Sequence, residues 1–181
     1  RDYAQILEDE LATLDYSGGF TEISQQLTKI LQQNLDISSV DILIEVEENE
    51  LSTVYSTQDK NTKLRLDNPM FDVILNADHP VVFKSHLDTH HALNSAKREI
   101  QRVMDVNFAD AMIVLKEGRK ILGLIFLGPK KLGNVFTNYD LNVFTSLYSY
   151  FFVVGYYLKN IANESVVGTV NRELQFSGQI I

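Results

Sequence analysis

The sequence predicts a mixed α/β domain of the α+β type, in which helices surround short strands that are joined by tight turns. Three observations support this fold class. The 181 residues are 45% hydrophobic and 22% charged, a balance typical of a folded domain. Several short segments are rich in β-branched residues, as strands are. The segments around them repeat apolar residues at steps of three and four, as amphipathic helices do.

The N-terminal part of the chain predicts two helices followed by two strands. A Ser-Gly-Gly break separates a helix over residues 2–15 from a second helix that begins at Phe20. Alternating β-branched residues then predict a strand over residues 40–46, and an acidic turn leads to a second strand over 51–55. We interpret the acidic run within residues 45–50 as solvated charge at the edge of a sheet.

The middle of the chain predicts an exposed polar loop, a helix, a strand, a second loop and a second helix, over residues 58–63, 69–77, 81–83, 86–93 and 95–107. Asn68 followed by Pro69 is typical of a helix start, with asparagine as the cap and proline at the first helical position. Asn94 or Ser95 is expected to cap the second helix, because both side chains can accept a hydrogen bond from a free backbone amide.

The C-terminal part predicts a hairpin and a long helix. Strands over residues 111–115 and 121–127 flank a Glu-Gly-Arg turn, and the second strand is apolar enough to lie at the centre of a sheet. Thr137 and Asp140 are spaced as in a capping box, at the start of one helix that runs to residue 161. Because this helix is apolar on two faces, we expect it to pack against its own sheet and against a partner chain.

Charge and composition exclude several classes of function. The chain has 16 basic and 24 acidic residues and a net charge of −8, so it repels nucleic acid and anionic membrane surfaces. The absence of cysteine excludes disulfides, thiol catalysis and thiolate metal sites, and it fits a reducing compartment, so we expect a cytoplasmic protein. Residues 141–158 carry no charge, but their polar side chains argue against a membrane span.

The most specific pattern lies near the end of the chain. Gly123-Leu124-Ile125-Phe126-Leu127-Gly128-Pro129-Lys130 leads through Gly133 to Phe136-Thr137-Asn138-Tyr139-Asp140, and an apolar helix follows. This order of a glycine-containing strand, a loop and a Phe-Thr-x-x-Asp helix start resembles the closing part of GAF domains, which are small-molecule-sensing and dimerisation modules of signalling proteins. The order of the preceding elements agrees with this resemblance over residues 19–161.

The resemblance implies a central antiparallel sheet of five to six strands, with long N- and C-terminal helices on one face and a ligand pocket on the other, under residues 58–109. It also implies that the first and last helices pair with those of a second subunit. Relatives that attach bilins or reduce methionine sulfoxide need cysteine, which this chain lacks.

Relatives that bind cyclic nucleotides carry an Asn-Lys…Phe-x-x-x-Asp-Glu signature. Phe136 and Asp140 match its Phe and Asp, and Lys130 is the candidate for its Lys. Pro129 stands in place of the Asn and Leu141 in place of the Glu, so the resemblance does not extend to cyclic-nucleotide binding.

These patterns divide the chain into three parts. Residues 1–16 are expected to form an N-terminal dimerisation helix, residues 17–161 the GAF-like sensory domain, and residues 162–181 a connecting helix toward a missing downstream domain. The last part has its own apolar seam, out of register with the preceding helix, at Val167, Val170, Leu174 and Ile181. A helix that leaves the domain and a frayed tail would both have this pattern.

Two sets of candidate site residues follow from the element order. Apolar side chains with Arg65 or His79 as polar anchors form the candidate ligand pocket, which consists of Tyr55, Arg65, Phe71, His79, Phe83, Met104, Phe108 and Met112. Each of them could instead fill the core. Apolar residues at helical spacing form the candidate dimer interface, which consists of Leu7, Leu11, Leu14, Leu147, Phe151, Val154, Leu158 and Ile161.

His86, His90 and His91 lie close together in the sequence and could bind a metal if they shared a helix face. Their segment is predicted to be a loop without a further fixed ligand, so we interpret them as a polar surface and expect neither a metal nor a cofactor. The chain lacks a Gly-x-Ser-x-Gly elbow, a phosphate-binding glycine loop and a His-Glu-x-x-His motif, so we expect no enzyme.

The sequence therefore predicts a small-molecule-sensing and dimerising regulatory domain of an intracellular signalling protein, non-catalytic, which transmits through its C-terminal helix. Its expected partners are a second copy of itself, a small molecule of unknown identity and a downstream output domain of the same chain. Two alternatives stay open. One is a purely structural dimerisation module, and the other is a metal-dependent enzyme that uses the histidine cluster.

Overall fold

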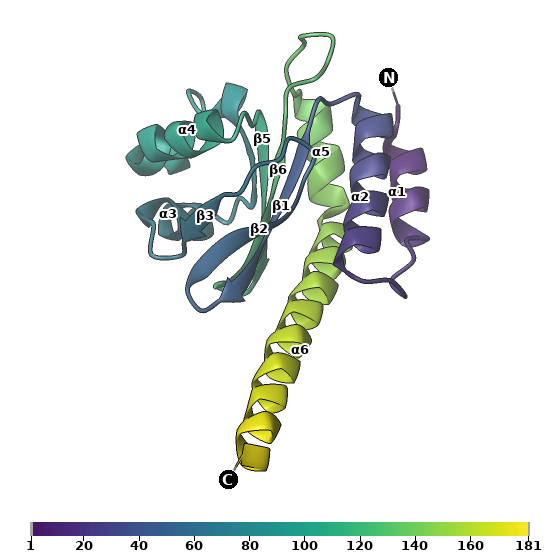
Figure 1. The fold of residues 1–181 in the computed structure, drawn as a ribbon. Helices are drawn as coiled ribbons and strands as arrows, with labels where there is room; N and C mark the ends of the chain where they lie inside the picture. The colour runs from purple at the N-terminus through teal and green to yellow at the C-terminus, as the bar shows by residue number, and fades with distance from the viewer. Residues whose placement is uncertain (1, 181) are drawn as a thin grey trace.

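The computed structural model describes the chain from residue 2 to residue 180, with side-chain positions up to residue 164. A six-stranded antiparallel sheet forms the centre and helices lie on both of its faces (Figure 1). The main elements are α1 (Ala4–Ala12), α2 (Phe20–Leu35), β1 (Val40–Glu47), β2 (Glu50–Ser56), β3 (Lys63–Arg65), α3 (Pro69–Ala77), β4 (Val81–Phe83), α4 (Lys97–Val106), β5 (Ala111–Glu117), β6 (Lys120–Leu127), α5 (Asn138–Ser146) and α6 (Tyr148–Ile180).

The strand order in the sheet is β3-β2-β1-β6-β5-β4, so the first and the last strands of the chain lie side by side at the centre. Val40 pairs with Leu127 and Ile44 pairs with Gly123 along this central contact. The predicted antiparallel sheet and the predicted β5–β6 hairpin are confirmed. The sequence did not predict β3, which has only three residues and pairs with the start of β2.

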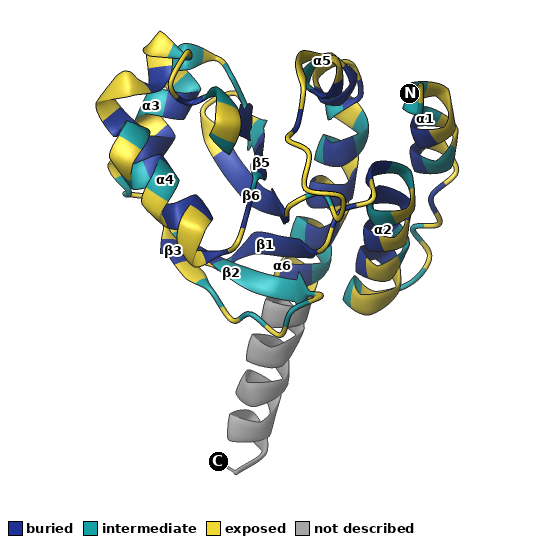
Figure 2. Cartoon of the chain, turned by 90° about the horizontal axis from the view of Figure 1, so that it is seen from above, coloured by how far each residue is buried: buried dark blue, intermediate teal, exposed yellow. Residues whose placement is uncertain are grey.

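Side chains alternate across the sheet and form two cores, because successive residues of a strand point to opposite faces. Val40, Ile42 and Ile44 of β1 face α2 and α6, whereas Leu43 faces α3 and α4. The first core, here called the α2–α6 core, contains Leu27, Leu31, Ile125, Phe144 and Phe151, and the second, the α3–α4 core, contains Leu51, Ile74, Ile100, Leu124 and Phe126. Figure 2 shows the buried central strands between these two helical layers.

Two predicted helix starts are confirmed and one is wrong. The side chain of Asn68 accepts a hydrogen bond from the backbone amide of Met70 at the start of α3. Thr137 and Asp140 form a complete capping box at the start of α5. Neither Asn94 nor Ser95 caps α4, because the 3-10 helix η2 (His91–Ala96) runs directly into it.

The predicted single helix from residue 137 to 161 is interrupted at Leu147, where α5 ends and α6 begins. Tyr148 follows the break and turns its hydroxyl to the sheet. The hydroxyl donates a hydrogen bond to the carbonyl oxygen of Val114 (2.6 Å) and accepts one from the amide of Lys116 (2.9 Å). These two backbone groups flank an irregularity in the β5–β6 register, so a side chain replaces the missing strand partner. Burial raises the pKa of this phenol.

Gly155 permits the close approach of α6 to β5, and Gly123 permits the close pairing of β6 with β1. A Cβ atom on Gly155 of α6 would lie 2.5 Å from Cδ1 of Leu115 in β5. A Cβ atom on Gly123 of β6 would lie 2.6 Å from the carbonyl oxygen of Leu43 in the neighbouring strand. Real Cβ atoms essentially never lie so close to another atom, so an added side chain would have to displace its neighbour at either position. At Gly123 that neighbour is backbone, so glycine there sets the spacing of the two central strands.

The terminal helices differ in part from the predictions. The first helix is shorter than predicted, and α6 continues without a break to Ile180, through the predicted connecting segment 162–181. The predicted seam from Val167 to Ile181 lies outside the described side chains. Of the helices that the structure describes, none is both long and apolar enough to cross a membrane.

Candidate functional site

The eight residues of the predicted ligand pocket do not line one cavity, which corrects that prediction. Phe83 belongs to the α2–α6 core, and Tyr55 packs against the same core. The side chains of Phe71, Met104 and Met112 lie across the sheet, fully buried in the α3–α4 core. The predicted pocket residues therefore lie on both faces of the sheet, although the order of helices and strands in the sequence had suggested one common pocket.

The remaining residues of the predicted pocket, Arg65, Phe108 and His79, do not lie together either. Arg65 is exposed and forms an ion pair with Asp67 at its own end of β3. Phe108 is 60% exposed and has a left-handed backbone with φ of 52°. His79 lies half-buried beside His90, away from the α3–α4 core. Neither Arg65 nor Phe108 can therefore line a buried pocket in this structure.

A buried acid that the sequence analysis did not identify lies on the α3–α4 side of the sheet. Asp41 in β1 is 1% exposed, and its carboxylate accepts hydrogen bonds from the Ser56 hydroxyl (2.5 Å) and from the Gln58 amide (2.7 Å). The same amide of Gln58 also donates to the carbonyl oxygen of Asn107 at the end of α4 (3.2 Å). The sequence did contain one indication. Asp41 lies two residues before Leu43 in the same strand, so both side chains point to the same, buried face of the sheet.

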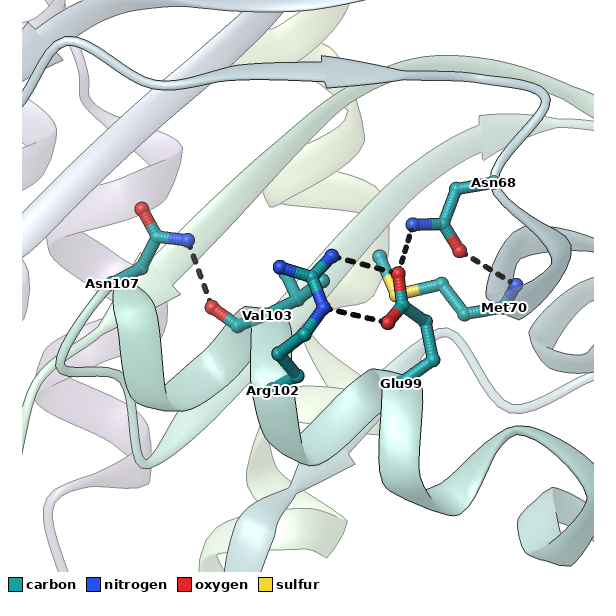
Figure 3. A network of polar contacts seen from close by, with 6 residues as sticks. All are labelled: Asn68, Met70, Glu99, Arg102, Val103 and Asn107. Atoms are coloured by element: carbon teal, nitrogen blue, oxygen red, sulfur yellow. Dashed lines mark hydrogen bonds and ion pairs between the residues drawn. The ribbon is translucent and has the colours of Figure 1, made fainter.

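The predicted exposed loop over residues 58–63 is therefore partly buried and tied to the end of α4. Lys60 donates to the carbonyl oxygen of Val106 (2.9 Å), and the Thr62 hydroxyl donates to the side chain of Asn107 (2.8 Å). The side-chain amide of Asn107 donates in turn to the carbonyl oxygen of Val103 (2.8 Å; Figure 3). The loop thus closes the side of the α3–α4 layer.

A second polar cluster joins the start of α3 to the start of α4 (Figure 3). The Glu99 carboxylate accepts two hydrogen bonds from the guanidinium of Arg102 (2.7 and 2.8 Å) and one from the amide of Asn68 (2.6 Å). These donors lower the pKa of Glu99 to about 2. Because Asn68 also caps α3, one side chain fixes the relative position of both helices.

Three of the four histidines line a small cavity of about 180 Å³ between β4, the following turn and α5. His79 and His90 are in edge-to-face contact with ring centroids 4.2 Å apart. His86 packs against Phe83 at a centroid distance of 5.3 Å. Among the described residues, no group of three or more histidine, cysteine or acidic side chains is placed to hold a metal ion.

The free energy of unfolding is expected to decrease as the pH falls from neutral, because of His90. Burial and the neighbouring histidines lower the pKa of His90 below its ordinary value of 6.5. Just below that pH the unfolded chain binds a proton that the folded chain does not, so stability is complete above it and is lost as the pH falls toward the lower folded pKa. Urea unfolding of the native chain and of His90→Gln, from about pH 7.5 to about pH 5, measures this contribution.

The decline in stability should be smaller in His90→Gln, which cannot take up the proton. His91→Gln is the matched control, because His91 is exposed and does not line the cavity. Parallel pH profiles of the native chain and His90→Gln would contradict the assignment.

A buried ion pair connects the N-terminal segment, the loop after β6 and α5. Asp140 is 3% exposed and accepts hydrogen bonds from the Tyr3 hydroxyl (2.6 Å), the Lys130 ammonium (2.7 Å) and the Thr137 amide (2.8 Å). Burial alone would raise the pKa of Asp140, but these three donors outweigh it and hold the pKa below its ordinary value. Phe136, which with Lys130 and Asp140 matches the signature of the cyclic-nucleotide-binding relatives, is buried and stacks on Phe83 (4.9 Å between centroids).

The predicted dimer-interface residues lie in the core of a single chain, which corrects that assignment. Leu7, Leu11 and Leu14 are buried between α1 and the rest of the α2–α6 core. The same core buries Leu147 at the break before α6 and the α6 residues Phe151, Val154 and Leu158. Half-buried Ile161 of α6 packs at the edge of this core. Their helical spacing reflects packing within the chain.

The opposite face of α6 is aromatic and exposed. Val153, Tyr156 and Tyr157 are 37%, 45% and 43% exposed. The ring of Tyr156 stacks on Phe152 at a centroid distance of 6.2 Å, and Tyr157 stacks on Tyr16 at 4.3 Å. We call Phe152, Val153, Tyr156 and Tyr157 the α6 aromatic face.

At the end of the sheet, α6 is tied to β1 by Lys159. Its ammonium donates to the carbonyl oxygen of Glu45 (2.5 Å) and lies 3.3 Å from the Glu45 carboxylate. Both side chains are nearly buried, so Glu45 is not part of a solvated acidic run as predicted. Ala162 is the last buried residue of the described part of α6, so this ion pair lies where the helix leaves the domain.

Comparisons with known proteins agree with this architecture. No protein-family model and no curated protein matches the chain. Among solved structures, the GAF domain of a phosphoenolpyruvate-protein phosphotransferase from Coxiella burnetii is 11% identical, with a TM-score of 0.53, over 92% of this chain and 95% of that domain. The corresponding Acinetobacter GAF domain is 10% identical, with a TM-score of 0.50, over 92% of this chain and 93% of that domain.

At these identities the likeness establishes the fold and no particular ligand. The six-stranded antiparallel sheet, with α2, α5 and α6 on one face and α3 and α4 on the other, and the high coverage of both chains lead to the same conclusion. The chain has the fold of a GAF domain.

Proposed function

We propose that this chain is a non-catalytic regulatory domain of a cytoplasmic signalling protein, which dimerises, senses a small molecule and transmits the result along α6 to an output domain. The structure of α6 supports this proposal most. One face of the helix is buried against the sheet, the other carries exposed aromatic rings, and the helix extends beyond the core. A change in the domain that moves α6 would therefore also change how two such helices pack.

The α6 aromatic face is the part of the chain that we expect to form the dimer contact. Tyrosine and phenylalanine are enriched at such contacts because they bury a large area with few rotatable bonds. The proposed interface therefore lies on the face of α6 opposite to the apolar residues that the sequence predicted to form it. It leaves the α2–α6 core intact in each subunit.

Light scattering of the purified chain at increasing concentration tests the dimer. We expect a dimer, and we expect Tyr156→Glu to weaken association by about 100-fold, since it places a charge in the centre of the contact. Leu132→Glu is the matched control, because Leu132 is 86% exposed and lies on the loop after β6. A native chain that stays monomeric, or a Tyr156→Glu variant that associates normally, would contradict this contact.

A thermal-shift screen against cyclic nucleotides, nucleobases, amino acids and small acids tests sensing. A ligand that binds only the folded state stabilises it by mass action, by about 2.7 kcal/mol at 100 times its Kd. A saturable rise in Tm with one compound class supports sensing. No shift with any compound, together with a stable dimer, would overturn it.

A purely structural dimerisation module is the second candidate. It is favoured by the complete burial of Phe71, Met104 and Met112, which fill the space between the sheet and the α3–α4 layer. In that case dimerisation through α6 would be the whole function, and the thermal-shift screen would be negative.

A further inference from the structure

The histidine-lined cavity of about 180 Å³ beside β4 differs in charge from the rest of the chain. The chain has 24 acidic residues against 16 basic ones, yet no acidic side chain lines this cavity among the residues that the structure describes. Its ionisable groups are the imidazoles of His79, His86 and His90, and the hydroxyl of Thr89 is its other polar side-chain group. The cavity can therefore gain positive charge and has no negative charge of its own.

The charged side chains that neighbour the cavity in sequence are each paired with another group. The pairs are Asp78 with Lys116 (3.6 Å), Lys84 with Asp105 (2.6 Å), Asp88 with Lys97, and Asp140 with Lys130 (2.7 Å). None of these side chains lines the cavity. Exposed His91 is a further titratable neighbour and also lies outside it. An anion in the cavity would thus meet imidazoles and no carboxylate.

The imidazole rings leave hydrogen-bond donors for a ligand. Nδ1 of His79 lies 2.9 Å from the carbonyl oxygen of Val81, and a carbonyl only accepts, so this nitrogen carries a proton. The rings of His86 and His90 form no hydrogen bond with the described part of the chain, and their nitrogens are not fully enclosed by protein. Because a neutral imidazole has one N–H, these two rings offer two donors, and protonation adds one on each.

A carboxylate matches this arrangement of donors. Its two oxygens accept hydrogen bonds from two N–H groups, and its negative charge strengthens both bonds. His79 and His90 are in direct contact, with ring centroids 4.2 Å apart, so a group that binds to one ring lies close to the other. Half-buried Leu141 and the carbon edges of the rings supply apolar surface, whereas Val81 and Phe83 are almost completely buried.

The volume of the cavity limits the size of the ligand. A water molecule in the liquid occupies about 30 Å³, so the cavity has room for about six non-hydrogen atoms. Acetate, propionate and butyrate fall within this limit. A nucleotide or a tetrapyrrole does not.

We propose that this cavity binds a short-chain carboxylate such as propionate. The carboxylate accepts hydrogen bonds from His86 and His90, and the aliphatic chain lies against Leu141. Binding favours the imidazolium form of His90, so the domain takes up a proton from solvent together with the ligand. The uncharged amide of the same acid has the same shape but supplies no charge to the imidazoles, so it should bind more weakly.

This coupling makes the affinity depend on pH. In the chain alone, burial and the neighbouring histidines lower the pKa of His90 below its ordinary value of 6.5. A carboxylate in contact with the ring favours its charged form and raises the pKa of His90 again. Because linkage is reciprocal, the affinity for the carboxylate increases as the pH falls from about 8 to about 6.

The site contacts the helices that lead out of the domain. Leu141 belongs to α5, and only Leu147 separates α5 from α6. A ligand held between the turn after β4 and α5 favours one position of α5 over others. The inference names the ligand class for the proposed sensing, and the effect on α5 rests on the proposed function, whereas binding itself does not.

NMR titration of the native 181-residue chain tests the site, because its four histidines give separate ring signals. Acetate, propionate and butyrate are added at constant ionic strength and about pH 6.5, with a chelator present, and their amides are the matched comparison ligands. We expect saturable shifts of the His79, His86 and His90 signals with at least one acid, with a Kd of about 1 mM because the ligand is small. Its amide should bind at least about tenfold more weakly, and the His91 signal should not move.

His90→Gln keeps an N–H donor but cannot become charged. It is expected to weaken carboxylate binding by about tenfold near pH 6 and to remove the increase in affinity between about pH 8 and about pH 6. His91→Gln is the matched control and should bind as the native chain does, because His91 lies outside the cavity. The comparison of acids with amides on the native chain does not depend on how either variant folds.

Three results would overturn the proposal, namely no saturable shift with any acid, equal binding of an acid and its amide, or native affinity and pH dependence in His90→Gln. Tighter binding of inorganic phosphate than of every acid would also overturn it. A thermal shift with another class of compound but with none of these acids would remove this site and leave the proposed function. Light scattering with and without the bound acid tests the converse, because binding that leaves association unchanged would support the site and contradict transmission through α6.

Discussion

Replacing Asp140 by asparagine is expected to destabilise the domain by about 3–5 kcal/mol, because it leaves the Lys130 ammonium buried without a counterion. The side chains of Lys130 and Asp140 are only 12% and 4% exposed, so water cannot compensate for the lost charge. Asparagine keeps the size of the side chain and one oxygen acceptor for the helix cap, which confines the change largely to charge. Chemical denaturation near neutral pH measures the difference.

Two companion measurements make this prediction specific. Lys130→Met in the Asp140→Asn background removes the stranded cation and should recover part of the lost stability. In the native chain the contribution of the lowered Asp140 pKa is complete above the ordinary value of 3.8 and is lost as the pH falls through the lower folded value. Asp140→Asn should lack this acid-dependent loss, and a variant within about 1 kcal/mol of the native chain would contradict the role of the pair.

Replacing Gly123 by alanine is expected to cost about 1–3 kcal/mol, and replacement by valine more, because the central strands must separate to accept a side chain. The new Cβ atom would meet a backbone carbonyl oxygen of β1 at 2.6 Å and Cδ1 of Ile44 at 2.8 Å. A backbone oxygen in a paired strand cannot move aside as a flexible side chain can. Urea unfolding of both variants would show the graded effect.

Gly19 provides the matched control for this substitution. It precedes α2 with an extended backbone, and the nearest atom to an added Cβ is the Glu22 carboxylate at 3.8 Å. Gly19 is the N-cap of α2, where glycine is favoured over alanine, so Gly19→Ala should cost about 0.5–1 kcal/mol, less than Gly123→Ala. Equal effects at the two positions would mean that the contact with β1 is not the cause.

Local sequence patterns predicted the elements whose signals lie within a few residues of each other. Asn68-Pro69 indicates the start of α3, and the Thr137–Asp140 spacing indicates the capping box of α5. The apolar 121–127 segment indicates a central strand, which the β1–β6–β5 pairing confirms. In these cases hydrogen bonding and burial are decided by neighbouring residues, so the sequence suffices.

Contacts between distant segments could not be predicted in the same way. The Asp140 capping box was expected, but its bond to Tyr3 joins residues 137 positions apart. The Glu45 carboxylate is nearly buried because Lys159 arrives from α6, which an acidic run of sequence does not indicate. An apolar helical seam such as Leu147 to Leu158 has the same spacing whether its own sheet or a second chain covers it, so only the structure could distinguish the two.

The strand order also determines when the sheet can be completed during synthesis. On one side β1 pairs with β2, the next strand in the sequence. On its other side it pairs with β6, the last strand of the sheet to be synthesised. Until then the inner edge of β1 has unpaired amides and carbonyls, and such edges are prone to pair with other chains. The exposed edge of β1 in the nascent chain is therefore protected from intermolecular pairing only after β6 has been synthesised.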